Sequence, residues 1–164
     1  MTDARFEDGA ERPLRLLARD AEDLTVLSAL VQDAVLGGAD MRYDRTRRRF
    51  SLLINRFRWE DEARAKAGGR PYERVRAVLD FSDVTAVAHQ GLSRDADTVL
   101  SLLSVTYEPE DAAAPEGPAG PGRVILTFAG DGALALTVEC LEVGLADVTR
   151  PYRAPSGRAP SHPA

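Results

Sequence analysis

Residues 123–140 read RVILTFAGDGALALTVEC, with apolar residues at every second position on both sides of a Gly-Asp-Gly turn. A period of two places alternate side chains on the same face of a strand, and a short glycine-containing turn lets two strands pair antiparallel. The segment therefore predicts a β-hairpin with one buried face. Its apolar face consists of Val124, Leu126, Phe128, Leu134, Leu136, Val138 and Cys140.

The same alternation recurs upstream and predicts further strands. They cover residues 13–17, 72–81, 84–89 and 99–107, with a second hairpin over 41–54. The strands at 72–81 and 84–89 are expected to be neighbours. Phe57 and Trp59 have the opposite parity to the preceding apolar residues, so a β-bulge or bend is predicted near Asn55-Arg56. Residues 141–148 fit either a strand or a short helix.

One helix is predicted near the start of the chain. Asp20 is a suitable N-cap, and Glu22 and Asp23 would lie in the first turn, where the helix dipole favours acids. Apolar residues then recur at helical spacing as far as Val35, and Gly37-Gly38 would end the helix.

Together these elements predict an α+β fold. The expected architecture is an N-terminal amphipathic helix packed on a bent, largely antiparallel sheet or small barrel of about six to seven strands, as in pleckstrin-homology-like barrels. Residues 1–13 are expected to be a flexible N-terminus and 14–150 a single domain. Residues 108–122, with four prolines, predict a disordered insertion, and 151–164 a disordered Pro-rich tail.

The composition is that of a globular protein, with 44% hydrophobic and 29% charged residues in 164. The first residues lack the apolar stretch of a secretory signal, and no run is long enough to span a membrane, so a cytoplasmic location is expected. The single Cys140 cannot form an internal disulfide, and it is interpreted as a buried core thiol.

No catalytic, metal or cofactor site is predicted. The two histidines, His89 and His162, lie far apart in the chain, and one cysteine with two histidines cannot supply the usual four ligands of a structural zinc. The glycines of 117–122 alternate with prolines and lack the lysine of a phosphate-binding loop. Glu60, Asp61 and Glu62 have no apolar surroundings in the sequence that would raise a carboxyl pKa, and indicate a solvated charge run.

The basic residues are concentrated in one region. Residues 42–76 hold 12 basic and 5 acidic side chains, a net charge of +7 within a chain of net charge −5. Arginines alternate there with aromatic residues, and such a surface suits phosphate, carboxylate or stacked bases. The alternative is that the arginines form the solvated face of a hairpin. The candidate ligand-binding residues are Arg42, Arg45, Arg47, Arg48, Arg56, Arg58 and Arg74.

Several segments resemble a known family. They are LRLLARDAEDL (14–24), QDAVL (32–36), RFSLLINRFRWE (49–60), Glu73 to Val75, Leu100 to Leu103 and Val138 to Leu141. These segments resemble the bacterial domain-of-unknown-function family 2948, and the resemblance covers most of residues 14–150. The matching residues are packing and turn motifs, so the resemblance implies relatives and assigns no activity or functional residue.

Three functional hypotheses follow. The first is a non-enzymatic binding or adaptor domain that uses the Arg-rich hairpin to bind an anionic ligand, RNA or an acidic protein partner. The second is a structural or regulatory protein that acts by homo-oligomerisation through an exposed strand edge or apolar patch. The third is an enzyme with a pocket of carboxylates and arginines that sequence order does not reveal.

Overall fold

The computed structural model describes residues 13–69, 72–93, 95, 97–111 and 119–153. The expected disorder of residues 1–12, 112–118 and 154–164 lies outside the described residues. The elements are β1 (Arg15–Ala18), α2 (Ala21–Leu30), β2 (Ala34–Gly37), β3 (Met41–Asp44), β4 (Arg49–Phe57), η1 (Trp59–Asp61), α3 (Glu62–Ala67), β5 (Glu73–Phe81), β6 (Val84–Gln90), β7 (Val99–Pro109), β8 (Gly122–Phe128), β9 (Ala133–Val138), β10 (Val143–Asp147) and β11 (Tyr152–Arg153).

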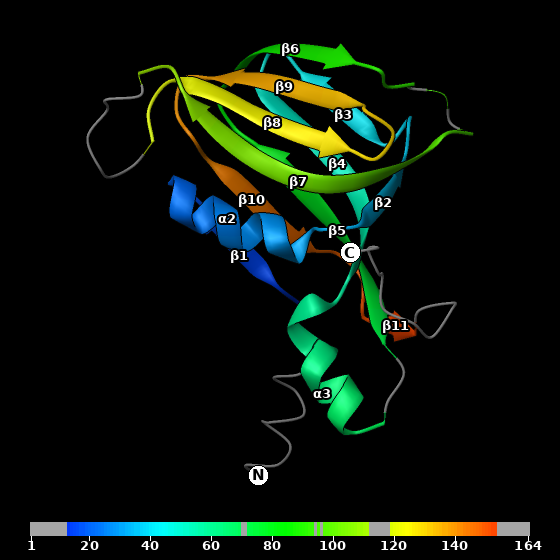
Figure 1. Cartoon of the computed structure of the whole chain (residues 1–164). Helices are drawn as coiled ribbons and strands as arrows, with labels where there is room; N and C mark the ends of the chain where they lie inside the picture. The colour runs from blue at the N-terminus through cyan, green and yellow to red at the C-terminus, as the bar shows by residue number, and fades with distance from the viewer. Residues whose placement is uncertain (1–12, 70–71, 94, 96, 112–118, 154–164) are drawn as a thin grey trace.

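The described residues are mostly β-structure, in one 11-stranded antiparallel sheet. The strand order is β1-β10-β5-β4-β2-β7-β8-β9-β6, with β3 added to β4 and β11 to β5. The sheet curls over the core and stays open, because β1 and β6 are its ends and do not pair with each other (Figure 1). The predicted α+β class, with six to seven strands and a possible pleckstrin-homology-like barrel, is therefore wrong.

The predicted N-terminal amphipathic helix is wrong as well. The Asp20 carboxylate does cap a helix, accepting from the N–H of Asp23 at 2.7 Å, but α2 ends at Leu30. It is short and weakly amphipathic, with Leu24 and Leu27 buried and Val26 exposed. The residues predicted as its second half form β2, because their backbone pairs with β7 over four residues.

The register of β4 with β5 has no break where a bulge or bend is predicted. It is continuous from Phe50 to Phe57, so the predicted β-bulge near Asn55-Arg56 is wrong for this strand pair. Phe57 is nevertheless buried, although it has the opposite parity to Phe50, Leu52 and Ile54. Phe57 is buried on the opposite face, where its ring meets Trp59 edge-on at a centroid distance of 4.7 Å. Arg56 takes the next position in the row of Phe50, Leu52 and Ile54 and is itself fully buried.

The pairing partners of the remaining strands agree only in part with the sequence-based expectations. The predicted hairpin of β8 and β9 is confirmed, with Leu126 opposite Leu134. Strands β5 and β6, expected to be neighbours, do not pair, because the chain crosses at Ser82-Asp83 and β6 pairs with β9. Residues 143–147 form strand β10 between β1 and β5. Beyond the expected domain boundary, β11 pairs with β5.

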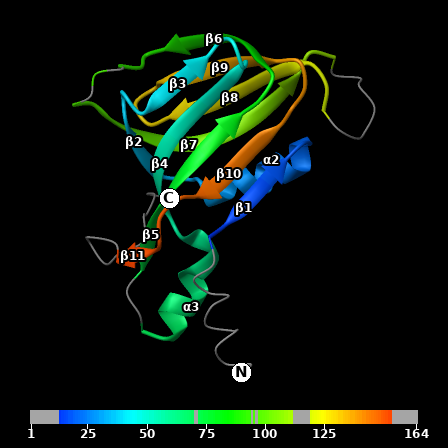
Figure 2. The same cartoon turned by 180° about the vertical axis from the view of Figure 1, so that it is seen from behind.

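One hydrophobic core lies inside the curled sheet. Strands β4, β5, β7, β8, β9 and β10 supply most of it, including Phe81, Phe128 and Leu136. Figures 1 and 2 show β6 and β3 at one end of the molecule and α3 extending from the other. The described part of the chain has no helix with the length and apolar character needed to cross a membrane.

Candidate functional site

The turn between β3 and β4 carries three exposed arginines, Arg45, Arg47 and Arg48, and a fourth, Arg49, begins β4. Local hydrogen bonds shape this turn. The Asp44 carboxylate accepts from the Arg47 N–H at 3.1 Å, and the Arg45 carbonyl accepts from the Arg48 N–H at 3.3 Å. Arg48 has φ 53°, a left-handed conformation that is uncommon for a residue with a Cβ. All four residues of the turn, 45–48, are exposed.

On the outer face of β3 and β4 lies a hollow of about 330 Å³, here called the outer hollow. The cross-strand register brings its lining together, with Arg42 opposite Ser51 and Asp44 opposite Arg49. The Arg49 Nε lies 3.1 Å from Asp80, and Arg47 lies 4.0 Å from Asp44. Arg42 makes no ion pair with any described residue. The lining is Arg42, Asp44, Arg47, Arg49 and Ser51.

A second hollow, of about 470 Å³, separates the hairpin from β6 and is here called the edge hollow. Two backbone-linked contacts close its inner end. The Tyr43 hydroxyl donates to the Val84 carbonyl at 2.8 Å, and the Val84 N–H donates to the Arg48 carbonyl at 2.8 Å. Its lining is Tyr43, Arg45, Arg48, Thr85, Ala86 and Val87.

The two arginines of the edge hollow differ in their pairing. Arg48 Nη1 lies 2.9 Å from Glu139 Oε2, and its Nη2 lies 3.8 Å from Asp83. Arg45, also exposed, has no carboxylate of the described residues within ion-pair distance. Among the arginines that line the two hollows, Arg42 and Arg45 therefore have no ion pair with a described residue and are available to an external anion.

The aromatic residues of the Arg-rich region are buried or half-buried. Phe50 and Phe57 are buried in the protein. The indole N–H of Trp59 donates to the Gln32 carbonyl at 2.9 Å, and its ring packs on Phe57. The alternation of aromatic and basic residues in the sequence thus reflects the two faces of β4, and it forms no exposed stacking platform.

Arg56, Arg58 and Arg74 lie at the other end of β4 and β5, where they bind the protein's own polar groups. Arg56 makes two bidentate pairs, to Glu60 at 2.8 and 2.7 Å and to Asp147 at 3.0 and 2.9 Å. Burial would raise the pKa of the Glu60 carboxyl, but the hydrogen bonds and charge of Arg56 outweigh it and hold that pKa below its ordinary value.

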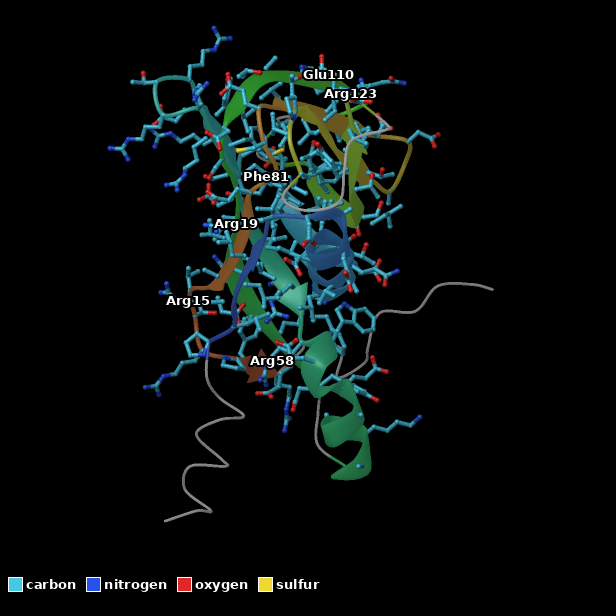
Figure 3. All side chains as sticks on the ribbon, turned by 90° about the vertical axis from the view of Figure 1, so that its left-hand side faces the viewer. Arg15, Arg19, Arg58, Phe81, Glu110 and Arg123 are labelled. Atoms are coloured by element: carbon cyan, nitrogen blue, oxygen red, sulfur yellow. The ribbon has the colours of Figure 1, made fainter. Side chains whose placement is uncertain are left out.

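The two other arginines of this group are also engaged. Arg58, buried beside η1 (Figure 3), pairs with Glu73 at 2.7 Å. Arg74 donates to the side chain and the carbonyl of Asn55 at 2.7 and 3.0 Å, and its burial lowers its pKa. The structure therefore divides the seven predicted arginines. Arg42, Arg45, Arg47 and Arg48 share the hairpin, and Arg56, Arg58 and Arg74 form a separate, internally paired network.

Cys140 is exposed, and its predicted burial is wrong. Strand β9 ends at Val138, so Cys140 leaves the alternating row and its thiol donates to Asp83 at 2.9 Å. That hydrogen bond, with burial and nearby acids, raises the pKa of the thiol to about 11. Because the thiolate is the nucleophilic form, this site disfavours thiol reactivity at neutral pH.

The other chemistry-bearing residues do not converge. His89 is exposed on β6 and lines neither the outer hollow nor the edge hollow. Within the part of the chain that the structure describes, no three His, Cys, Asp or Glu side chains are placed to hold a metal ion.

Several residues that line the two hollows are not among the predicted binding residues. Arg49 and Ser51 line the outer hollow, and the register of β4 and β5 brings both to Asp80. Thr85 to Val87 meet the hairpin only because β6 crosses to the far end of the sheet. A period-two pattern identifies the strands and their faces, but it contains no signal for these long-range neighbours.

The family described as "Protein of unknown function (DUF2948)" matches residues 14–162. The chain belongs to this family. The match covers the whole hairpin, β6 and the buried ion-pair network, and it confirms the resemblance seen in the sequence. No curated protein and no solved structure gave a significant match. Membership of the DUF2948 family thus brings no activity to this chain, and a function must be argued from the surface itself.

Proposed function

We propose that this DUF2948 protein is a non-enzymatic binding domain whose β3–β4 hairpin recognises an acidic segment of a partner protein. The observation that supports it best is the convergence of exposed arginines on two adjacent hollows, with Arg42 and Arg45 unpaired among the described residues. Arginine forks bind carboxylates bidentately, and two arginines that have no ion pair to break need little reorganisation to do so.

An acidic protein segment suits this surface better than RNA. Sequence-tolerant RNA binding uses exposed aromatic rings on which bases stack. Here Phe50 and Phe57 are buried, and the half-buried Trp59 ring packs against Phe57. The lining also has mixed charge, with Asp44 in the outer hollow and Asp83 and Glu139 bound to Arg48. A dense row of phosphates would meet these carboxylates, whereas a segment with spaced Asp or Glu residues can avoid them.

The test compares two triple variants with the same change in net charge. Arg42→Ala/Arg45→Ala/Arg47→Ala removes three of the five arginines at residues 42–49 of the hairpin, and Arg15→Ala/Arg76→Ala/Arg150→Ala removes three exposed arginines elsewhere. The probe is a fluorescein-labelled peptide of alternating valine and glutamate, followed by anisotropy. We expect the hairpin variant to bind at least about tenfold more weakly and the control within about twofold of the parent, with affinity falling as salt is added.

Equal losses in the two variants would assign the binding to overall charge and contradict the proposal. So would tighter binding of an unstructured RNA oligonucleotide of matched charge, because the RNA would then be the preferred class of ligand.

A further inference from the structure

Strand β6 is an edge strand without the usual protection. It is the terminal strand of the sheet order and pairs with β9 along one side only. Its sequence VTAVAHQ contains no Asp, Glu, Lys, Arg or Pro. Most of its residues are exposed. Proteins normally block such edges with charges, prolines or short strands, since unpaired backbone groups attract other strands.

The opposite edge of the sheet differs from β6. Strand β1, at that edge, has only four residues and carries the charged Arg15. Strand β3, the other strand beside the edge hollow, also carries charges, Arg42 and Asp44. Strand β6 does have one irregularity, a register shift between Val84 and Ala86, and its pairing with β9 is regular from Ala86 to Gln90. Five consecutive residues therefore form a regular, uncharged edge.

The free side of this edge faces the Arg-rich hairpin. Both outward backbone groups of Val84 are used by the hairpin, its carbonyl by Tyr43 and its N–H by the Arg48 carbonyl. Beyond Val84 the described residues make no backbone hydrogen bond to this side of β6. In an antiparallel pair alternate residues direct N–H and C=O away from the partner strand, so β6 continues with unpaired groups. The edge hollow opens directly beside Thr85 to Val87.

From this geometry we infer that the acidic partner segment binds in an extended conformation, adding a strand to the free edge of β6 and placing a carboxylate at Arg45 in the edge hollow. Backbone pairing supplies the affinity in such strand addition, and side-chain pockets supply the specificity. This inference rests on the proposed function and adds the conformation of the ligand. A second copy of β6 is a poorer occupant, because Val84 to Gln90 has no carboxylate to offer Arg45.

The experiment uses the full chain and the valine–glutamate peptide in two N-methylated forms. In one form the odd-numbered amides are methylated, and in the other the even-numbered amides. An added strand directs only alternate N–H groups to its neighbour, so one form should bind at least about tenfold more weakly than the other. Charge attraction alone would treat the two forms alike.

A matched pair of variants locates the binding. Ala88→Glu puts an acid on the exposed edge of β6, and Thr106→Glu puts the same acid on an exposed position of β7, inside the sheet order. We expect Ala88→Glu to weaken the binding of the peptide. Thr106→Glu should leave the affinity for the peptide within about twofold of the parent's. Both positions are exposed, and circular dichroism checks that each variant is folded.

The outcomes separate this inference from the proposed function. The two methylated forms could bind equally well, and this binding could still be lost in the Arg42/Arg45/Arg47 variant. That result would overturn strand addition and leave the hairpin as the binding surface. Failure of every acidic peptide to bind would overturn both. Light scattering could also reveal a dimer that dissociates in the Ala88→Glu variant but not on addition of the peptide. That result would assign the edge of β6 to a second copy of the chain and would also overturn the inference.

Discussion

Arg56 shows how a residue chosen as a binding candidate can be structural. It is fully buried, and its five donors face Glu60, Asp147 and the Phe57 carbonyl. Asp147 in turn accepts the Leu14 N–H at 2.9 Å, so one side chain links β4, η1, β10 and the residue before β1. Such a pair adds little net stability over an apolar core, but removing one partner leaves buried charge without compensation.

We therefore expect Arg56→Met to lower the free energy of unfolding by about 3–5 kcal/mol, because the buried Asp147 carboxylate would lose its ion-pair partner. Urea unfolding measures this change. Arg49→Met is the matched control, since Arg49 and its partner Asp80 are both partly solvent-exposed and such a pair contributes only about 0–1 kcal/mol. Similar losses in the two variants would show that the Arg56 network is not a stabilising unit.

At the scale of elements, the β7–β8 pair depends on a glycine at its open end. A methyl group on Gly122 would collide with the Glu108 carbonyl oxygen and lie 2.7 Å from a ring carbon of Tyr107. The Tyr107 hydroxyl donates to the Gly120 carbonyl at 2.6 Å, which holds the ring over this position. A side chain at residue 122 would therefore force the Glu108 carbonyl or the Tyr107 ring to shift at the open end of this strand pair.

Gly122→Ala should destabilise the protein by about 1–3 kcal/mol, the usual cost of overpacking. Gly120→Ala is the control, because no atom lies within 4 Å of the place its methyl group would take. We expect the control to stay within about 0.5 kcal/mol of the parent. Thermal or urea unfolding gives both values, and equal stabilities of the two variants would contradict the packing described for Gly122.

The elements also show how far local pattern reaches. Alternation over 123–140 was sufficient for the β8–β9 hairpin, because its partners are close in sequence. It failed at 31–37, where apolar residues fit a helix and a strand equally well and only pairing with the distant β7 decides. It failed again for the fold class, because the strand order depends on contacts such as β6 with β9 and β1 with β10.

The candidate site was predictable to a similar extent. The concentration of arginine pointed to the hairpin, where Arg42, Arg45, Arg47 and Arg48 do lie together. The same concentration included Arg56, Arg58 and Arg74, whose acidic and amide partners are brought to them by folding. The sequence gives the number of arginines but not the acidic groups that pair with them after folding. It therefore could not distinguish an arginine without an ion pair from one that is neutralised.

At the scale of the whole molecule, the charges and the sheet edge occupy one end, and the buried ion-pair network lies at the other end of β4 and β5 (Figures 1 and 2). The homo-oligomer hypothesis stays a prediction, and it competes for the same edge of β6. The enzyme hypothesis also stays a prediction. Its natural location, the Arg–carboxylate network, consists of groups that are already bound to one another.

Hydrogen–deuterium exchange of the full chain, with and without a saturating amount of the valine–glutamate peptide, tests directly whether the β3–β4 hairpin and β6 bind an acidic segment. Backbone amides that gain hydrogen bonds or lose solvent exchange more slowly. We predict slower exchange in the β3–β4 turn and along β6, with α3, β1 and β11 unchanged. Slower exchange confined to elements away from the hairpin and β6 would contradict the central claim that this end of the molecule binds the acidic partner.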